Sequence, residues 1–392
     1  MRRRAGVLAG ALVLLAVSLG LAACGGKSGG GDSTSASGGL PEKIKIGAIS
    51  EITGPVPTLG AESKGYEAAV KWINANGGID GHEIELTVQD NAGEPAKAVS
   101  DLRTYAQQGV KLVVGGAFGP DCAAEAPVAA ESEMIVFCGS TDNLPEPDDH
   151  MFGVGLGYSP TIEAAAKELI SPYSKKPAVF ADKDKSGDDT AEEAPVQLEK
   201  AGTEPILIRT APTESSFKAS IQKAISEGAD GLWFSECTPA AISAVGDAKA
   251  LGYEEKIYLE NCLASYEVAE ALKGLVGNEQ MVTLQVPSML LPGKAPNKEE
   301  QEAIELFEEA VPGKPNVVIG AGWDSIFIIK KLLEQTKTED VEANLKALED
   351  NFQFHGVWQG GTYTKDDHRG AIAEGYATPA AITPQGTFEA LK

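Results

Sequence analysis

The chain has 392 residues, which is more than one hydrophobic core usually holds, so we expect two lobes. Apolar residues make up 43% of it, which indicates a folded body and excludes a wholly disordered protein. The formal net charge of −24, with no block of Lys or Arg beyond Arg4, excludes an electrostatic route to nucleic acid and predicts that the acidic residues serve solubility.

The N-terminus predicts export. Arg2–Arg4 form a positive region, Val7–Leu21 is apolar, and Leu21–Cys24 provides a cleavage site with small residues. A transmembrane anchor is the alternative, but the apolar run is shorter than the roughly 20 residues that a span needs. We therefore expect residues 1–23 to be a signal peptide.

Leu21-Ala22-Ala23-Cys24 is also similar to a bacterial lipobox, which implies that Cys24 carries a lipid anchor. Two acyl chains hold a protein stably at a membrane, whereas one does not. Residues 24–41 are mostly Gly, Ser, Thr and Ala, which cannot bury apolar surface, so they predict a flexible tether. The expected location is the outer face of a bacterial cytoplasmic membrane, or the periplasm.

Four cysteines remain after Cys24, and an even number in an exported chain suggests disulfides. Three pairings are possible. The spacing favours Cys122 with Cys138 and Cys237 with Cys262, since each pair would lie at the carboxyl ends of neighbouring strands. Four buried thiols are the alternative.

Strands and helices alternate along the body, which predicts an α/β fold with two doubly wound parallel sheets. The first series has strands at 43–49, 83–89, 111–114, 134–138 and 151–154, with helices at 63–76 and 94–108 and an Ala-rich helix before residue 134. The second has strands at 177–181, 204–208, 231–235, 256–259 and 281–286, with helices at 161–171, 190–201, 216–227, 239–251 and 266–273. Helices at 298–310, 322–336 and 341–350 and short strands near 357, 362 and 377 follow.

The stretch 111–141 contains the clearest candidate site. Two predicted parallel strands in it end in glycines, followed by Ser140 and Thr141. Ligands bind off the carboxyl ends of such strands, where backbone N–H groups and hydroxyls converge. We expect a small-molecule site at this edge.

Several segments resemble the branched-chain amino acid (Leu/Ile/Val) binding proteins of ABC importers. The most specific is Ile73–Gly81, and Ile46–Ala48, Gly54-Pro55 and Val114–Gly116 also match. The resemblance covers about residues 42–388. It implies a type I periplasmic binding protein fold, in which two lobes joined by three crossovers close on a solute. The implied lobes are 42–157 plus 287–355 and 158–286 plus 356–392.

In the first lobe, the resemblance implies that Gly139, Ser140 and Thr141 grip a carboxylate together with Phe118 and Gly119. Hydroxyls at a strand end can also simply cap the next turn. Leu59 stands where relatives have an aromatic residue, and the resemblance places Trp323 beside the cleft, although an aromatic residue there can equally be core.

In the second lobe, Ser186 occupies a position that is often aromatic in relatives. Asn261 occupies the position of the acidic partner of a solute ammonium, next to Glu260, and Glu236 and Cys237 stand where relatives have another aromatic residue. An ammonium needs a carboxylate partner in a dehydrated cleft, which Glu236 or Glu260 could supply.

No metal, cofactor or catalytic site is predicted. Residues 182–193 partly fit a calcium loop, but they follow a strand where a helix should stand, which favours an ordinary acidic strand-to-helix loop. The four histidines are far apart, and no nucleophile elbow or phosphate loop occurs.

The predicted function is a lipid-anchored, monomeric, non-enzymatic protein that binds a branched-chain or other amino acid by hinge closure and delivers it to an ABC permease. An aromatic acid, an amide or a urea-like compound is the alternative solute. A ligand-sensing receptor domain of the same fold is the rival from another class, and an enzyme is the third possibility.

Overall fold

The computed structural model describes residues 39–140, 150–155, 158–183, 185–211, 214–235, 239–275, 282–291, 293–314, 316–358, 360–372 and 377–391. All of them belong to one compact unit, Gly38–Lys392. The predicted signal peptide, Cys24, most of the tether, Thr141, Glu236 and Cys237 lie outside the described residues, as does the side chain of Ser186. Within the described part, no helix is both long and apolar enough to cross a bilayer.

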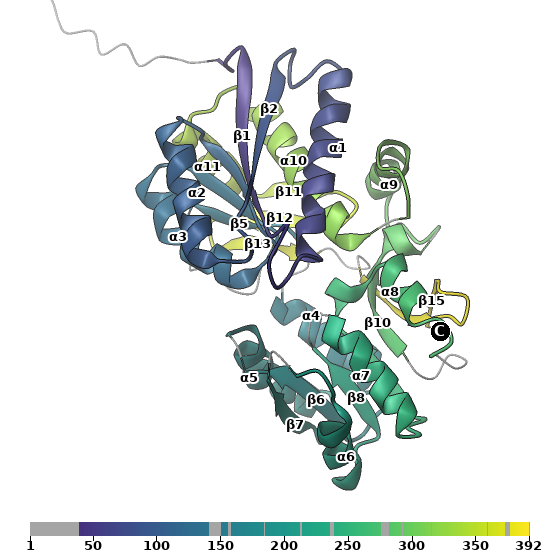
Figure 1. Cartoon of the computed structure of the whole chain (residues 1–392). Coiled ribbons are helices and arrows are strands. Elements are labelled where there is room, and N and C mark those ends of the chain that lie inside the picture. Colours follow the sequence, from purple (N-terminus) through teal and green to yellow (C-terminus); the bar gives the residue numbers. More distant parts are fainter. Residues whose placement is uncertain are drawn as a thin grey trace, which may run out of the picture. The chain divides into compact units, whose positions relative to one another are not determined.

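The first sheet has five parallel strands in the order β2-β1-β3-β4-β5. Its strands are β1 (Lys43–Ser50), β2 (Glu83–Asp90), β3 (Leu112–Gly115), β4 (Ile135–Cys138) and β5 (Met151–Gly153). The short η1 (Leu59–Ala61) and the helices α1 (Glu62–Ala75), α2 (Pro95–Gln107) and α3 (Gly119–Glu131) connect them. This is the predicted first series, with helices on both faces of the sheet (Figure 1).

The side chains of β1 alternate between the two faces of the sheet, which explains why helices cover both faces. Ile44 and Ile46 join the hydrophobic cluster that includes Tyr66 of α1, whereas Ile49 joins a second cluster with Leu102 of α2. Successive strand side chains point to opposite faces, so each face of β1 buries apolar surface against its own helix layer. The apolar part of β1 is therefore buried on both sides.

The predicted end of α1 is confirmed to within one residue, because Asn76 is the residue that follows its last turn. Gly77 and Gly78 adopt φ values of 98° and 70°, and the N–H of Gly78 donates to the carbonyl of Ile73 at 2.9 Å. Glycine adopts this left-handed backbone without a side-chain penalty, which is why the Asn-Gly-Gly sequence ends the helix.

The second sheet has seven strands in the order β15-β14-β10-β9-β8-β6-β7. They are β6 (Pro177–Asp182), β7 (Ile206–Thr210), β8 (Gly231–Phe234), β9 (Lys256–Leu259), β10 (Val282–Pro287), β14 (Ala377–Ile382) and β15 (Phe388–Ala390). The first five are parallel, and β14 and β15 pair antiparallel. The helical segments here are α4 (Tyr158–Ala164), the π-helical η2 (Ala165–Ile170), α5 (Lys185–Lys200), α6 (Lys218–Ser226), α7 (Pro239–Ala250), η3 (Asn261–Leu263) and α8 (Tyr266–Ala271).

The chain then returns to the first sheet. This segment contains η4 (Ser288–Leu290), α9 (Lys298–Ala310), α10 (Val317–Thr336), α11 (Val341–Glu349) and the antiparallel strands β11 (Phe352–His355), β12 (Gly360–Thr364) and β13 (Asp367–Ile372). Helix α10 packs closely along α1, since a Cβ at Gly65 would lie 2.1 Å from the carbonyl oxygen of Ile319. A Cβ at Gly322 would lie equally close to the carbonyl oxygen of Glu62, so glycine is required on both helices.

One predicted lobe boundary shifts. The sequence resemblance places residues 356–392 in the second lobe as one stretch, but β12 and β13 contact β5 of the first sheet. Tyr363 donates its hydroxyl to the carbonyl of Gly153, and His368 stacks on Phe152 with ring centroids 4.1 Å apart. Sequence alone could not show this, because the contact joins residues more than 200 positions apart. The last passage to the second sheet therefore comes after Ile372, where β14 begins at Ala377.

Candidate functional site

The carboxyl edge of the first sheet brings together the ends of β3 and β4. Gly115 and Cys138, the last residues of these strands, are paired in register. The N–H of Gly139 donates to the carbonyl of Gly116 at 3.1 Å, which holds the two following turns side by side. This is the edge at which residues 111–141 predict the candidate site.

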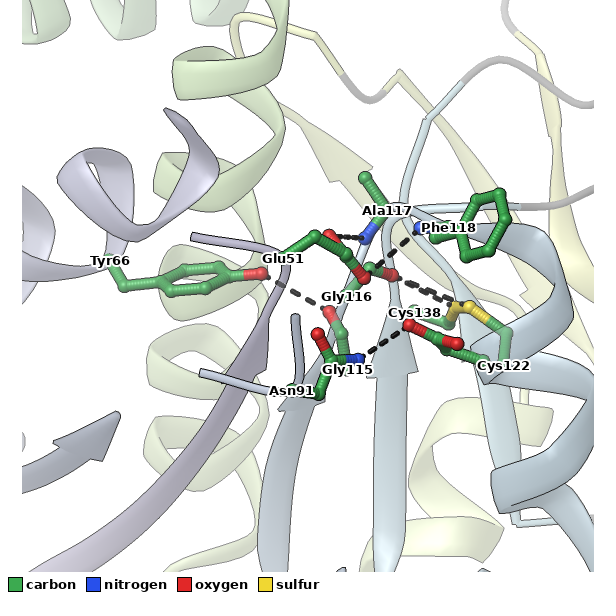
Figure 2. The surroundings of a disulfide bond; sticks show 10 residues. Glu51, Tyr66, Asn91, Gly115, Gly116, Ala117, Phe118, Cys122 and Cys138 are labelled. Carbon is green, nitrogen blue, oxygen red and sulfur yellow. Dashed lines mark hydrogen bonds between the residues drawn. A yellow bond between two sulfur atoms is a disulfide. The ribbon is translucent and has the colours of Figure 1, made fainter. Parts of the chain in front are cut away.

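A disulfide joins Cys122, in the first turns of α3, to Cys138 at the end of β4, with their Cα atoms 6.2 Å apart (Figure 2). This is one of the two pairings that the spacing favours. Both sulfur atoms lie near the carbonyl oxygen of Gly116, at 3.4 and 3.3 Å. Cys262 is also disulfide-bonded, and its partner lies outside the described residues, so the pairing with Cys237 stays a prediction.

The turn after β3 directs two backbone N–H groups at a side chain of the protein itself. Ala117 donates to Oε2 of Glu51 at 3.3 Å, and Phe118 donates to Oε1 at 3.4 Å (Figure 2). Glu51 directly follows β1 and is fully buried. Phe118 is the N-cap of α3, so the carboxyl lies where a helix N-terminus favours negative charge.

Three more carboxyl groups are buried around Glu51. Glu62 comes from the start of α1, and Asp121 and Glu125 come from adjacent turns of α3. Asn91 donates to Asp121, whereas neither oxygen of Glu62 or Glu125 has a hydrogen-bond partner within the described part of the chain. We call Glu51, Glu62, Asp121 and Glu125 the buried acidic cluster.

Burial favours the protonated form of these acids. Burial, and after it the negative charge of Asp121, raise the pKa of Glu51 to about 7. Burial raises the pKa of Asp121 to about 6, against the hydrogen bond from Asn91, which lowers it. Burial and neighbouring negative charge also raise the pKa values of Glu62 and Glu125 well above the ordinary 4.5. The cluster therefore retains protons near neutral pH.

The strand-end glycines make room for these carboxyl groups. A Cβ at Gly116 would lie 1.8 Å from Oε1 of Glu51, and a Cβ at Gly115 would lie 2.8 Å from Oε2 of Glu125. A Cβ at Gly139 would lie 3.0 Å from Oε2 of Glu62. These glycines thus allow the close approach of the protein's own acids, in addition to any role toward a ligand.

The structure brings together most of the predicted first-lobe residues. Phe118 is half-buried at the N-terminus of α3, which begins at Gly119, and Gly139 and Ser140 follow the end of β4. Ser140 is 7% exposed. Leu59 is half-buried in η1, just before α1.

Trp323 lies in α10 and is part of the hydrophobic core. Its side chain is 1% exposed. It stacks on Phe327 at 4.7 Å between centroids and meets the edge of Phe307 at 5.6 Å. This geometry corresponds to the core alternative for this residue, and a ligand contact of Trp323 stays a prediction.

In the second sheet, Asn261 is half-buried at the start of η3, after the carboxyl end of β9. Its backbone N–H donates to the carboxyl of Glu260 at 3.3 Å, and burial raises the pKa of Glu260 to about 7. Glu260 is therefore a buried acid directly after the end of β9. The positions of Glu236 and of the Ser186 side chain stay outside the described residues.

The acidic stretch at 182–193 makes protein contacts, and most of it is helical, because β6 ends at Asp182 and α5 begins at Lys185. Asp182 accepts the hydroxyl of Thr210 at 2.9 Å, and Asp188 forms an ion pair with Arg209 at 2.6 Å. In the described ranges, no group of three or more His, Cys, Asp or Glu side chains is placed to hold a metal ion.

Sequence reasoning missed the buried acidic cluster, because its members resemble the many solvated acids of the chain. Two signals were present. Glu51 directly follows a predicted strand, at the edge where ligands bind. Asp121 and Glu125 are four residues apart, so on a helix they share one face, and that helix is otherwise rich in alanine.

Comparison with known proteins identifies one family. The profile of the periplasmic binding protein family matches residues 43–381. Among curated proteins, the Leu/Ile/Val-binding protein homolog 3 of Brucella melitensis is 30% identical over 200 residues, which cover 49% of this chain and 54% of that protein. The chain thus spans about half the length of the curated relatives it matches first.

Solved structures share the fold over most of the chain. An extracellular ligand-binding receptor from Rhodopseudomonas palustris is 19% identical with a TM-score of 0.77, covering 89% of this chain and 99% of that chain. The branched-chain amino acid transporter substrate-binding protein LivJ of Streptococcus pneumoniae, solved in complex with isoleucine, is 22% identical with a TM-score of 0.74, covering 89% and 98%. At these identities, the similarity concerns the fold.

Proposed function

Because this chain belongs to the periplasmic binding protein family and has its type I fold, we propose that it is the extracytoplasmic solute-binding protein of an ABC importer. The family match over residues 43–381 is the observation that carries this proposal, since it spans both sheets. The protein binds a small organic solute and presents it to a permease, and it acts as a monomer without catalysing a reaction.

The mechanism is hinge closure. The chain passes three times between the two sheets, after β5, after β10 and after β13, and these passages act as the hinge. A solute that contacts both lobes only in the closed state shifts the population toward closure. The permease then distinguishes the closed, loaded form from the open one.

The solute is held between loops at the strand ends. On the first sheet, Phe118, Gly119, Gly139, Ser140 and Thr141 contact its polar head. On the second sheet, Ser186, Glu236 and Asn261 select the rest of it. Backbone N–H groups and hydroxyls at such edges bind polar head groups well, which is why parallel sheets place ligands there.

The first solute class is a branched-chain or other amino acid, which the names of the relatives favour. An amide or urea-like solute is the second class. The contact of Glu51 with the N–H groups of Ala117 and Phe118 favours it, because those donors would otherwise be open to a solute carboxylate.

A ligand screen tests the binding role. The melting temperature of the purified full-length protein is followed by tryptophan fluorescence against amino acids, aromatic acids, amides and urea derivatives. Stabilisation by one class identifies the solute. If leucine, isoleucine and valine fail and another class succeeds, the first solute class is wrong and the binding role stands. Failure of every class contradicts the role.

Ser140→Ala then tests the site. Loss of one hydrogen bond to a polar or charged head group is expected to weaken binding about 10-fold. Ser100→Ala, on the exposed face of α2, is the matched control and should bind as the wild type does. Equal affinities of wild type and Ser140→Ala would remove Ser140 from the site.

We also propose that Cys24 anchors the protein to the membrane. The test is detergent phase partitioning of bacteria that express the wild type or Cys24→Ala. The wild type should enter the detergent phase and incorporate labelled fatty acid, whereas the variant should do neither. Equal partitioning of the two proteins would contradict the anchor.

A further inference from the structure

We propose that Glu51 occupies, from inside the protein, the place that a solute carboxylate would take on the first sheet. The solute therefore presents to this sheet an uncharged head group that donates hydrogen bonds, such as a carboxamide, and not a free carboxylate. This solute class rests on the proposed solute-binding function.

The backbone donors that would bind an anion at this edge already donate to the protein itself. The N–H groups of Ala117 and Phe118 lie at the carboxyl end of β3 and at the N-terminus of α3, which is the preferred place for a bound anion. Both donate to the two carboxyl oxygens of Glu51, one to each. Figure 2 shows the Glu51 carboxyl between these donors and the strand end at Gly115.

The carboxyl of Glu51 also fills the space beside the end of β3. Oε1 of Glu51 lies so close to Gly116 that a Cβ there would be 1.8 Å away. Glu51 is fully buried, so its carboxyl fills this volume and leaves no exposed oxygen at its edge. A second carboxylate could reach the Ala117 and Phe118 donors only if Glu51 moved away.

Two acids at this place carry negative charge at pH 7. Glu62, Asp121 and Glu125 are buried around Glu51, and in the described part of the chain none of these four acids forms an ion pair with Lys, Arg or His. With pKa values of about 6 and about 7, Asp121 is largely ionised and Glu51 partly ionised at pH 7, so a carboxylate brought next to them would add like charge in a site of low dielectric. An uncharged donor avoids this repulsion.

Glu62 supplies a buried acceptor at the second strand end. Within the part of the chain that the structure describes, neither oxygen of Glu62 has a hydrogen-bond partner, and its side chain is 1% exposed. Oε2 of Glu62 faces Gly139, at the second strand end of the candidate site. A buried acceptor without a partner is costly, and an N–H donor of a solute would satisfy it. The carbonyl oxygen of Glu62 stays an acceptor when the carboxyl is protonated, and a carboxylate solute has no donor for it.

Matched ligand pairs test the solute class in the full-length protein. The pairs are leucine and leucinamide, isovalerate and isovaleramide, and benzoate and benzamide, with dissociation constants measured by calorimetry at pH 7. We expect the amide of the pair that fits the cleft to bind at least 10-fold more tightly than its acid. An acid that binds as tightly as its amide, or more tightly, overturns the proposal.

Glu51→Ala shows whether Glu51 sets this preference. The variant removes the carboxyl that fills the place and frees the N–H groups of Ala117 and Phe118, so the preference for the amide should fall at least 5-fold. The matched control is Glu300→Ala, which truncates another fully buried acid, on α9 and outside the cluster. An unchanged preference in Glu51→Ala, or an equal change in both variants, overturns the role of Glu51.

Acetate binding tests, without any solute, whether Glu51 blocks an anion site at the N–H groups of Ala117 and Phe118. With ¹⁵N-labelled alanine and phenylalanine, the backbone N–H signals of Ala117 and Phe118 are followed in Glu51→Ala and in the wild type. Acetate should shift both signals in Glu51→Ala and neither in the wild type, with chloride at equal ionic strength as control. Shifts in both proteins, or in neither, contradict the proposal. If Glu51→Ala does not fold, Glu51→Ser replaces it.

The two proposals fail in different ways. If no compound of the screen binds the wild type, the solute-binding function fails, and the acetate experiment still decides whether Glu51 fills an anion site. If solutes bind but the acids of the pairs are preferred, the function stands and the inference about Glu51 fails.

Discussion

The carboxylate of Asp324 accepts the backbone N–H of Trp358 at 2.7 Å, although the two residues are 34 positions apart. The other oxygen of Asp324 accepts the N–H of Val357 at 3.0 Å. Asp324 is fully buried in α10, so one carboxylate fixes the turn between β11 and β12 to that helix. The chain runs from this turn toward the last passage between the sheets. The position of the turn therefore depends on α10.

Removing this carboxylate should destabilise the protein. Asp324→Ala leaves the buried N–H groups of Val357 and Trp358 without this acceptor, at a cost of about 1–3 kcal/mol for each. The free energy of unfolding in urea, measured by tryptophan fluorescence, checks this. Asp366→Ala, on an exposed side chain, is the control and should lie within about 0.5 kcal/mol of the wild type. Similar values for the two variants would refute the role of Asp324.

The disulfide between Cys122 and Cys138 should stabilise the turn that carries the candidate site. Its sequence separation is 16, and closing a loop of that length restricts the unfolded chain by about 3 kcal/mol. The double variant Cys122→Ser with Cys138→Ser should lose a free energy of this order. Either single variant should lose at least as much, because it also leaves an unpaired thiol. A double variant as stable as the wild type would argue against a formed bond.

Trp323 should behave as a core residue. Trp323→Ala removes contacts with Phe307 and Phe327 and should cost about 3–5 kcal/mol, whereas Trp323→Phe should cost less because it keeps an aromatic ring. Solute affinity of the folded Trp323→Phe protein should equal that of the wild type. A loss of affinity without a loss of stability would instead place the indole in the solute site.

The buried acidic cluster makes stability depend on pH. The pKa of Glu51 is about 7 in the folded protein, against an ordinary value of 4.5, so between these values the folded state binds a proton that the unfolded state has released. The pKa of Asp121 shifts in the same direction, to about 6. The stabilisation is complete below the ordinary pKa values and is lost as the pH rises toward 7.

We therefore expect a smaller free energy of unfolding at pH 8 than at pH 5, measured in urea at constant ionic strength. Glu51→Gln, which cannot ionise, should show a weaker decline over this range. Glu83→Gln, at an exposed position of β2, should keep the wild-type slope. Stability that rises from pH 5 to pH 8, or a slope unaffected by Glu51→Gln, would contradict a protonated cluster.

The order of helices and strands could be predicted because it depends on local patterns. The apolar strand that ends at Gly115 and the Asn76-Gly77-Gly78 sequence were readable from the chain, and the structure has a strand and a helix end at these places. The boundary between the two lobes could not be predicted in this way. Tyr363 and His368 pack on β5 through contacts between distant segments, which no local pattern records.

The sequence by itself determined the α/β class, the two series of strands, the edge at residues 111–141 and the resemblance to a family of binding proteins, because each of these follows from residue order. Only the tertiary structure decided which acids are buried. Glu51, Glu62 and Glu125 look like any of the 57 acidic residues along the chain. They become a cluster because the ends of β1 and β3, the start of α1 and the first turns of α3 meet at one place. The packing of these elements buries the acids, and burial raises their pKa values and so changes their chemistry.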